Sequence, residues 1–262
     1  MIHTILVAAL VIGGMGLVFG IILGIASKIF RADKDERLGL ILQVLPCANC
    51  GGCGYAGCSS YAQAIINGDA KSNECIVGGT KCSTKISSIM GSNDHFEKKV
   101  ARVKCAGNCD VSPVKYDYVG IDNCSAALKI ASGPKNCTYG CLGVGSCVKV
   151  CPQNAISINN GVAFVKESLC IGCGKCVNIC PRKLIELIPA KNDYTVTCSS
   201  ESKSSEVTKV CEIGCIGCRM CVKVCEYGAI TIEDNLAKID PEKCVNCGLC
   251  SEKCPRKIIK KF

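Results

Sequence analysis

The sequence predicts an α+β protein with one apolar amino-terminal helix, a small cysteine-rich domain, and a second cysteine-rich module that is present twice in tandem. Three observations support this prediction. Cysteine makes up 27 of the 262 residues, residues 2–27 carry no charged side chain, and a block of cysteines recurs at a fixed offset of 74 residues. A fixed-period repeat indicates that one structural unit is built twice.

The repeat extends from residue 124 to residue 254. Nine cysteines of the first copy recur in register in the second, with no insertion between them. They are Cys124, Cys137, Cys141, Cys147, Cys151, Cys170, Cys173, Cys176 and Cys180, followed by Cys198, Cys211, Cys215, Cys221, Cys225, Cys244, Cys247, Cys250 and Cys254. The sequence VKVC at 148–151 also recurs at 222–225, and CPRK at 180–183 recurs at 254–257. The two copies are therefore predicted to share one fold.

The second copy carries two runs of the form Cys-x2-Cys-x2-Cys-x3-Cys, and Pro255 follows the second run. This is the spacing of bacterial two-cluster ferredoxins, in which the fourth cysteine of each run ligates the other cluster. The predicted ligands are Cys215, Cys218, Cys221 and Cys254 for one [4Fe–4S] cluster, and Cys225, Cys244, Cys247 and Cys250 for the other. Zinc is the alternative, but zinc sites normally use two separated CxxC pairs.

The first copy repeats one of these ligand sets in full, and it departs from the other at one position. The complete set is Cys151, Cys170, Cys173 and Cys176. In the other set Val144 stands where the second copy has Cys218, so one ligand is missing. Cys137 lies within about one helical turn of Cys141, and it is predicted to replace the missing ligand. That set is then Cys137, Cys141, Cys147 and Cys180, and a three-iron cluster on the last three is the alternative.

Short β-branched runs separated by turn residues lie between the cysteines of each copy. Residues 155–158 and 162–165 flank an Asn-Asn-Gly turn, and residues 229–232 and 236–239 are their counterparts. Such alternation around a turn predicts small hairpins. Modules this small bury little apolar surface, so we expect the clusters to supply much of the core.

The amino-terminal apolar segment, residues 1–27, is long enough to span a bilayer. The basic residues Lys28, Arg31, Lys34 and Arg37 follow it, and no basic residue precedes it. The positive-inside rule then predicts an amino terminus outside the cell membrane and the cysteine-rich domains in the cytoplasm. A secretory signal would need a basic start and a shorter apolar run. Three glycines spaced four apart, beginning at Gly16, suggest a face for packing against another membrane helix, although glycine is also common in such helices.

A third cysteine pattern lies between the apolar segment and the repeat. Its spacing is Cys50-x2-Cys53-x4-Cys58-x16-Cys75, within the sequence NCGGCGYAGC and its distal cysteine. Its glycines allow the backbone to fold closely against a metal cluster. Four thiolates at this spacing predict one further [4Fe–4S] cluster.

An uncharged amino-terminal segment, the NCGGCGYAGC motif and a double ferredoxin together resemble the B subunit of the Rnf complex, in the cysteine-rich form of anaerobic bacteria. The resemblance covers nearly the whole chain. It implies a membrane-bound ferredoxin:NAD⁺ oxidoreductase that couples electron transfer to sodium or proton translocation. It also implies soluble ferredoxin, the membrane, and membrane and flavin-bearing subunits as partners. Its first cluster would be held by Cys50, Cys53, Cys58 and Cys75. The family often has glycine where this chain has Cys47, so Cys47 is predicted not to be a ligand. The alternative is that Cys47, and not Cys50, binds the first cluster.

Besides Cys47 and Cys82, five cysteines remain outside these sets: Cys105, Cys109, Cys124, Cys198 and Cys211. We expect a sixth cluster on Cys105, Cys109 and Cys124 with one of Cys198 or Cys211, and reduced structural thiols are the alternative. The chain is thus predicted to hold at least five [4Fe–4S] clusters, and six with this one. Cys82 is predicted to be a free thiol and His95 a solvated loop residue.

The formal charge of +9 counts every cysteine as neutral. Five or six clusters would contribute roughly −10 to −12, so the basic residues balance the clusters and do not predict nucleic-acid binding. The sequence has no P-loop, nucleophile elbow or dinucleotide fingerprint, and no catalytic residue is predicted. The predicted function is an electron relay inside a translocase. A membrane-anchored zinc or cluster scaffold, or the input subunit of another iron–sulfur enzyme, are the rivals.

The predicted domains are an anchor (1–27), a charged connector (28–44), a [4Fe–4S] domain (45–82), a connector with extra cysteines (83–123), and two ferredoxin modules (124–190 and 191–262). Arg182, Lys183, Arg256 and Lys257 follow cluster cysteines in the repeat. They are predicted either to attract an acidic ferredoxin or to be solvated charges.

Overall fold

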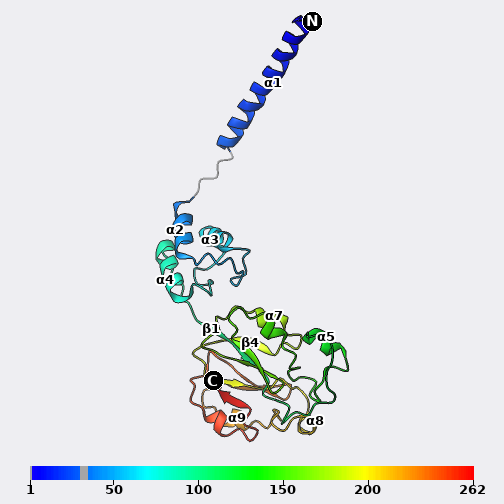
Figure 1. Ribbon diagram of the computed structural model, residues 1–262. Coiled ribbons are helices and arrows are strands. Elements are labelled where there is room, and N and C mark those ends of the chain that lie inside the picture. Colours follow the sequence, from blue (N-terminus) through cyan, green and yellow to red (C-terminus); the bar gives the residue numbers. More distant parts are fainter. Residues whose placement is uncertain (1, 30–34) are drawn as a thin grey trace. The chain divides into compact units, whose positions relative to one another are not determined.

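The computed structural model describes residues 2–29 and 35–262 (Figure 1). Met1 of the predicted anchor and residues 30–34 of the predicted charged connector lie outside this part. The chain divides into two compact units, Met1–Leu40 and Ile41–Phe262.

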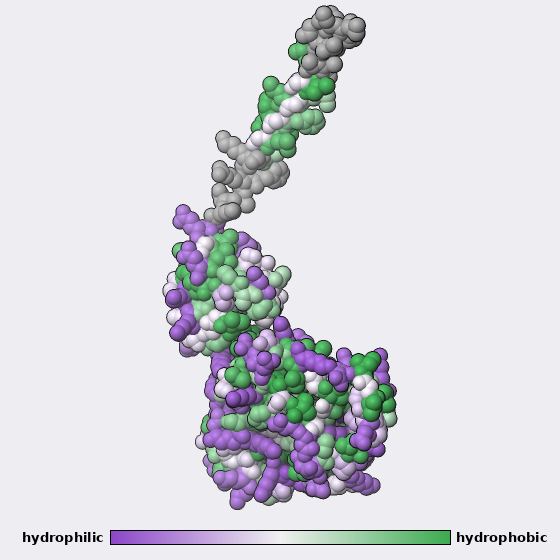
Figure 2. Space-filling model, in the orientation of Figure 1, coloured by the Kyte–Doolittle hydropathy of each residue, from purple (hydrophilic) through white to green (hydrophobic). Residues whose placement is uncertain are grey.

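The first unit contains helix α1, Ile2–Ile29, and the beginning of α2, Glu36–Val44. The described side chains of α1 are largely apolar and exposed, from Leu10 to Ile25, and Figure 2 shows them as a hydrophobic surface. In the part of the chain that the structure describes, no helix is both long and apolar enough to cross a membrane. The helix is thus confirmed, while its role as an anchor stays a prediction.

The second unit begins with a small helical domain around α3, Cys58–Asn67, and α4, Gly79–Met90. Its core contains Tyr61, Ile65 and Ile86, each at most 3% exposed. The Tyr61 hydroxyl donates to the Lys71 carbonyl at 2.7 Å, and it accepts from the Glu74 main-chain N–H at 3.0 Å. These bonds hold the loop that leads from α3 to Cys75.

The rest of the second unit contains four two-stranded antiparallel sheets. In the first module β1 (Lys99–Val103) pairs with β4 (Ile185–Pro189), and β2 (Ile156–Asn159) pairs with β3 (Val162–Val165). In the second module β5 (Tyr194–Val196) pairs with β8 (Ile259–Lys261), and β6 (Ile230–Glu233) pairs with β7 (Leu236–Ile239). The short helices between them are α5 (Cys124–Lys129), α6 (Ser146–Lys149), α7 (Lys175–Ile179), α8 (Ser204–Val210), α9 (Met220–Lys223) and α10 (Leu249–Glu252).

Both predicted hairpins, β2–β3 and β6–β7, are confirmed. Asn160 and Gly161 have φ values of 44° and 74° at the first turn, and Asp234 and Asn235 have 47° and 63° at the second. Two successive residues with positive φ make the type of tight turn that matches strand twist.

Strand β1 lies inside the range that the sequence predicted as a connector. Its residues pair with β4 from Lys99↔Pro189 to Val103↔Ile185, and four of its five side chains are buried. The first ferredoxin module therefore begins before residue 124. The partner strands are far apart in sequence, so local pattern alone did not reveal the pairing.

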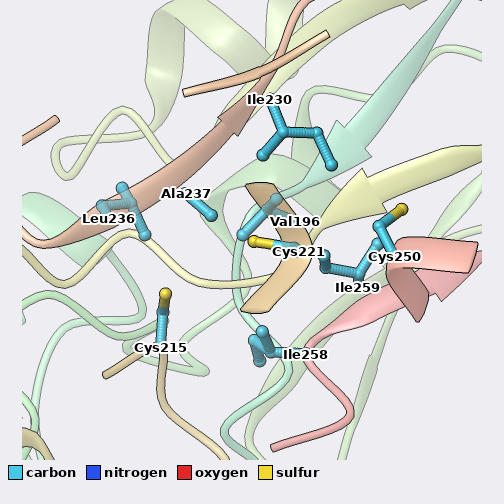
Figure 3. Packing of buried hydrophobic residues seen from close by; sticks show 9 residues of the cluster. All are labelled: Val196, Cys215, Cys221, Ile230, Leu236, Ala237, Cys250, Ile258 and Ile259. Carbon is cyan, nitrogen blue, oxygen red and sulfur yellow. The ribbon is translucent and has the colours of Figure 1, made fainter. Parts of the chain in front are cut away.

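Cysteines form part of the hydrophobic core of each module. In the second module Cys215, Cys221 and Cys250 lie among Val196, Ile230 and other aliphatic side chains (Figure 3). In the first module Cys147 and Cys176 pack with Val103, Ile156, Ile185 and neighbouring residues. Predicted ligands thus form part of both small cores, while the contribution of the clusters to the core stays a prediction.

Residues 104–112 cross from the first module to the second. The Lys104 N–H donates to the Leu184 carbonyl at 2.7 Å, and the Ala106 N–H donates to the Thr197 carbonyl at 3.0 Å. The Ser112 hydroxyl donates to the Val210 carbonyl at 3.0 Å. This segment therefore joins the two modules and carries Cys105 and Cys109 between them.

Candidate metal centres

All 27 cysteines are free thiols, and sixteen of them line four pockets, with four cysteines in each. We name these pockets by their cysteines. Pocket 1a has Cys124, Cys141, Cys147 and Cys180; pocket 1b has Cys151, Cys170, Cys173 and Cys176; pocket 2a has Cys215, Cys218, Cys221 and Cys254; and the junction pocket has Cys105, Cys137, Cys198 and Cys211.

Pockets 1b and 2a bring together the same cysteines that the sequence grouped by spacing. Burial raises the pKa of Cys176 to about 11, and the charges of Cys170 and Cys173 add to this shift. Burial likewise raises the pKa of Cys221 to about 11, with Cys215 among its neighbours. Thiols in such places become thiolates when a metal takes the proton's place.

Pocket 1a differs from the predicted set at one position. Cys124, at the start of α5, lines it with Cys141, Cys147 and Cys180, and Cys137 does not. Burial raises the pKa of Cys147 to about 12, and the charges of Cys141, Cys124 and Cys180 raise it further. The structure thus places a fourth thiol in this pocket, from a helix that precedes the cysteine run.

The junction pocket lies between the two modules. Burial raises the pKa of Cys211, and the charges of Cys137 and Cys105 also raise it. This pocket contains Cys105 from the predicted sixth set, together with both Cys198 and Cys211. Cys109 and Cys124 are not part of it. The Cys109 sulfur instead lies against Gly161, at the turn of the β2–β3 hairpin.

The sixteen thiols of these pockets fit [4Fe–4S] clusters, because no Asp, Glu or His of the described residues lines any of the four. Soft thiolate donors are the usual ligands of iron–sulfur clusters. No three Cys, His, Asp or Glu side chains in the described chain are grouped closely enough for a single metal ion. A cubane binds its thiolates through separate irons, so its ligands are spread more widely than those of one ion.

Main-chain N–H groups point at several of these sulfurs. Cys105 accepts from the Cys141 N–H at 3.3 Å, and Cys198 accepts from the Cys215 N–H at 3.3 Å. Cys151 and Cys180 accept from the N–H groups four residues further on, at 3.3 and 3.4 Å. Such bonds stabilise thiolates and tune the reduction potential of a bound cluster.

The predicted site of the small helical domain consists of Cys50, Cys53, Cys58 and Cys75. Burial raises the pKa of Cys53, and the charges of Cys75 and Cys50 contribute to the shift. The Cys82 thiol, 4% exposed, hydrogen bonds to the Cys75 sulfur and holds the pKa of Cys75 below its usual range. Sequence reasoning predicted Cys82 as a free thiol and gave no sign of this contact.

Cys47 makes a contact outside that group of sulfurs. It is exposed, and its thiol donates to the Leu42 carbonyl at 3.6 Å. Cys50 lies near Cys53, since its charge contributes to the raised pKa of Cys53. This geometry favours Cys50 as the ligand.

The two arginines of the CPRK sequences point inwards. Arg182 donates to the main-chain carbonyls of Cys137, at 3.1 Å, and of Gly140 and Ser132. Arg256 donates to the carbonyl of Cys211 at 2.9 Å and to that of Gly214 at 3.2 Å. These guanidinium groups are therefore engaged with the loops of the junction pocket. The adjoining lysines, Lys183 and Lys257, are exposed.

Three protein-family models match the chain. Residues 45–77 match a putative Fe–S cluster family, residues 133–191 match the LdpA Fe–S cluster-binding domain, and residues 214–258 match a 4Fe–4S dicluster domain. The matches cover the part of the small helical domain that carries Cys50, Cys53, Cys58 and Cys75, and much of both modules. They confirm the prediction that the chain is built from iron–sulfur domains of the 4Fe–4S ferredoxin type.

Curated relatives extend over almost the whole chain. The B subunit of the ion-translocating oxidoreductase complex of Methanosarcina acetivorans is 40% identical over 251 residues, which is 95% of each chain. The B subunit of the Na⁺-translocating ferredoxin:NAD⁺ oxidoreductase complex of Acetobacterium woodii is 42% identical, over 99% of this chain and 78% of that one. The proton-translocating counterpart of Clostridium ljungdahlii is 40% identical, over 98% and 93%. The chain therefore belongs to the family of B subunits of the ion-translocating oxidoreductase complexes, the Rnf complexes.

Proposed function

We propose that this chain is the electron-relay subunit of a membrane-bound ferredoxin:NAD⁺ oxidoreductase complex that couples electron transfer to Na⁺ or H⁺ translocation. The relatives from A. woodii and C. ljungdahlii carry these activities in their names. The observation that carries the proposal is the set of four pockets, each lined by four cysteines. A row of such sites suits one-electron transfer.

Five ligand sets follow for the relay. Each bound [4Fe–4S] cluster supplies a one-electron centre, and the chain supplies thiolates and main-chain donors that set its potential. The sets are Cys50, Cys53, Cys58 and Cys75; the four cysteines of pocket 1a; those of pocket 1b; those of pocket 2a; and Cys225, Cys244, Cys247 and Cys250. In pocket 1a we take Cys124 as the fourth ligand in place of Cys137, because it lines the pocket with the other three.

The amino-terminal segment would anchor the relay. Residues 2–27 carry no charged side chain, and the apolar side chains described on α1 are exposed, with Leu10 at 73%. A single pass with the amino terminus outside would keep the cluster domains in the cytoplasm, where thiols stay reduced. Removing residues 1–27 should release the chain from washed membranes. A truncated chain that still resisted alkaline extraction would argue against this anchor.

The expected electron donor is reduced soluble ferredoxin, and the expected acceptors are membrane and flavin-bearing subunits of the complex. Other subunits as electron acceptors fit the family, because its members are named as subunits of a larger complex. Exposed lysines beside cluster cysteines, Lys183 and Lys257, would attract an acidic donor.

Metal analysis and potentiometric EPR of the full chain, purified without oxygen in detergent, test the relay. We expect about 20 or more iron atoms, an equal amount of acid-labile sulfide, and reversible low-potential signals. A zinc scaffold would show neither the sulfide nor the signals. A colourless preparation, or one loaded with zinc, would remove the proposed function.

A further inference from the structure

The junction pocket has the same make-up as the pockets assigned to ferredoxin clusters. Four cysteines line it, as four line each of pockets 1a, 1b and 2a. Cys137 and Cys211 are 9% and 8% exposed, and Cys105 and Cys198 are half-buried. Four thiols are thus gathered around one pocket, and no ferredoxin ligand run explains this group.

Two of the four cysteines occupy equivalent places in the two modules. Val103 pairs with Ile185, and Val196 pairs with Ile259, which is the repeat equivalent of Ile185. In both modules the main chain of the next residue continues the pairing. The Lys104 N–H donates to the Leu184 carbonyl, and the Thr197 N–H donates to the Ile258 carbonyl. Cys105 and Cys198 therefore follow the same strand at the same position.

The other two cysteines are equivalent as well. Cys137 and Cys211 are related by the 74-residue repeat, and each precedes a glycine loop whose carbonyls accept from an arginine. Arg182 holds the Cys137 loop, and Arg256 holds the Cys211 loop. Each module thus contributes to the junction pocket one cysteine that follows a strand and one loop cysteine, at equivalent places in the two modules.

We propose that the junction pocket binds a [4Fe–4S] cluster through Cys105, Cys137, Cys198 and Cys211, and that this cluster carries electrons between the two ferredoxin modules. The inference rests on the proposed relay function. It replaces the sixth set predicted from sequence, because Cys109 and Cys124 do not line this pocket.

The contacts of the pocket place it between the neighbouring sites of both modules. The Cys141 N–H, from pocket 1a, donates to the Cys105 sulfur, and the Cys215 N–H, from pocket 2a, donates to the Cys198 sulfur, each at 3.3 Å. In the first module the fourth cysteine of each run lines the pocket of the other run: Cys180 lines pocket 1a, and Cys151 lines pocket 1b. A methyl group built on Gly52, beside Cys50, would lie 3.9 Å from the Cys173 Cβ of pocket 1b.

These neighbours give one line of sites: the small helical domain, pocket 1b, pocket 1a, the junction pocket, pocket 2a, and the site of Cys225, Cys244, Cys247 and Cys250. One electron passes at each step. The cluster that gives it is oxidised from the 1+ to the 2+ state, and the cluster that receives it is reduced from 2+ to 1+. Reduced ferredoxin supplies the electrons, and without the junction cluster the two modules would be separate two-centre units.

The double variant Cys137→Ala/Cys211→Ala tests the site in the full chain, purified without oxygen. It removes one ligand from each module and leaves every ferredoxin run intact. We expect iron to fall from about 24 to about 20 atoms per chain, with a matching loss of sulfide and of one cluster's EPR signal. The matched control is Cys109→Ala, which removes a thiol of the segment that carries Cys105 but lies outside the pocket, and it should keep all the iron.

A single variant, Cys198→Ala, covers the case in which the double variant does not fold. With three thiols left, the site should hold a three-iron cluster, seen as a new EPR signal in the oxidised protein that Cys109→Ala lacks. Unchanged iron, sulfide and spectra in the pocket variants would overturn the junction cluster. That result differs from failure of the relay itself, in which the unmodified chain would contain no iron–sulfur clusters.

Discussion

The Arg182 guanidinium donates a hydrogen bond to the main-chain carbonyl of Cys137 at 3.1 Å. Arg256 repeats this relationship with Cys211 at 2.9 Å. Burial lowers the pKa of Arg182, and the charges of Cys137 and Cys141 oppose that shift. A guanidinium group stays protonated even so. Each module therefore places a fixed positive charge beside the loop that carries a junction cysteine.

Replacing Arg182 with glutamine should destabilise the loop of Cys137. Several main-chain carbonyls would lose a charged donor, and leaving such groups unsatisfied costs about 1–3 kcal/mol. We expect a lower apparent unfolding midpoint in anaerobic heating scans. We also expect less iron in the junction pocket. The matched control is Lys183→Gln, which changes the exposed neighbouring residue. Equal midpoints for the two variants would show that the arginine bonds contribute nothing to stability.

Gly217, in the cluster loop of pocket 2a, should not tolerate a side chain. Its φ is +63°, and an added Cβ would lie 2.9 Å from the Asn235 carbonyl oxygen. Gly228 has a similar φ of +60° with nothing within 4 Å, so Gly228→Ala serves as the control. Both alanines pay about 1–2 kcal/mol for the left-handed backbone.

Steric overlap adds about 1–3 kcal/mol for Gly217→Ala alone. We therefore expect this variant to have the lower unfolding midpoint and the faster loss of iron to a chelator. Chelation kinetics under nitrogen measure both variants directly. Equal rates for the two alanines would mean that the loop can move away from the hairpin at little cost.

The parts of the molecule that could be predicted from sequence are those fixed by local spacing. The hairpins around Gly161 and Asn235 follow from turn residues between alternating runs, and pockets 1b and 2a follow from fixed cysteine intervals. The choice between Cys124 and Cys137 could not be made this way. It depends on how the fold places α5 beside the cluster loop, whereas the spacing of Cys137 and Cys141 gives only their distance along one helical turn.

The equivalence of Cys105 and Cys198 was hidden for a related reason. The 74-residue offset aligns Cys198 with Cys124, while strand pairing aligns it with Cys105. Strand β1 lies outside the repeat, and its partner β4 is distant in sequence. One local signal was available: Val103-Lys104-Cys105 and Val196-Thr197-Cys198 share a valine two residues before the cysteine.

Cys82 should set the potential of the first cluster without binding it. Its thiol hydrogen bonds to the Cys75 sulfur and lowers the pKa of Cys75, and the same bond should stabilise the more negative, reduced cluster. We expect Cys82→Ala to shift that cluster's midpoint potential to a more negative value, by tens of millivolts, with unchanged iron. Cys82→Ser keeps a donor and should restore most of the potential. Potentiometric EPR measures the shift. Loss of iron in Cys82→Ala would instead make Cys82 a ligand.

Lys183 and Lys257 should speed the encounter with reduced ferredoxin. Both are exposed beside cluster cysteines, whereas the adjoining arginines bond to main-chain carbonyls. Reversing charge at a docking surface slows association, and salt screens the effect. We expect Lys183→Glu/Lys257→Glu to lower the rate of reduction by ferredoxin about tenfold or more at low salt, and less at high salt.

The control for this prediction is Lys129→Glu/Lys209→Glu, which makes the same change in net charge at two exposed lysines of α5 and α8. Stopped-flow reduction of the clusters by ferredoxin, at several salt concentrations, compares the two variants. If both variants slow the reaction equally, the effect comes from net charge alone. If neither variant slows it, ferredoxin docks elsewhere, because two added carboxylates would repel an acidic partner that bound at Lys183 and Lys257.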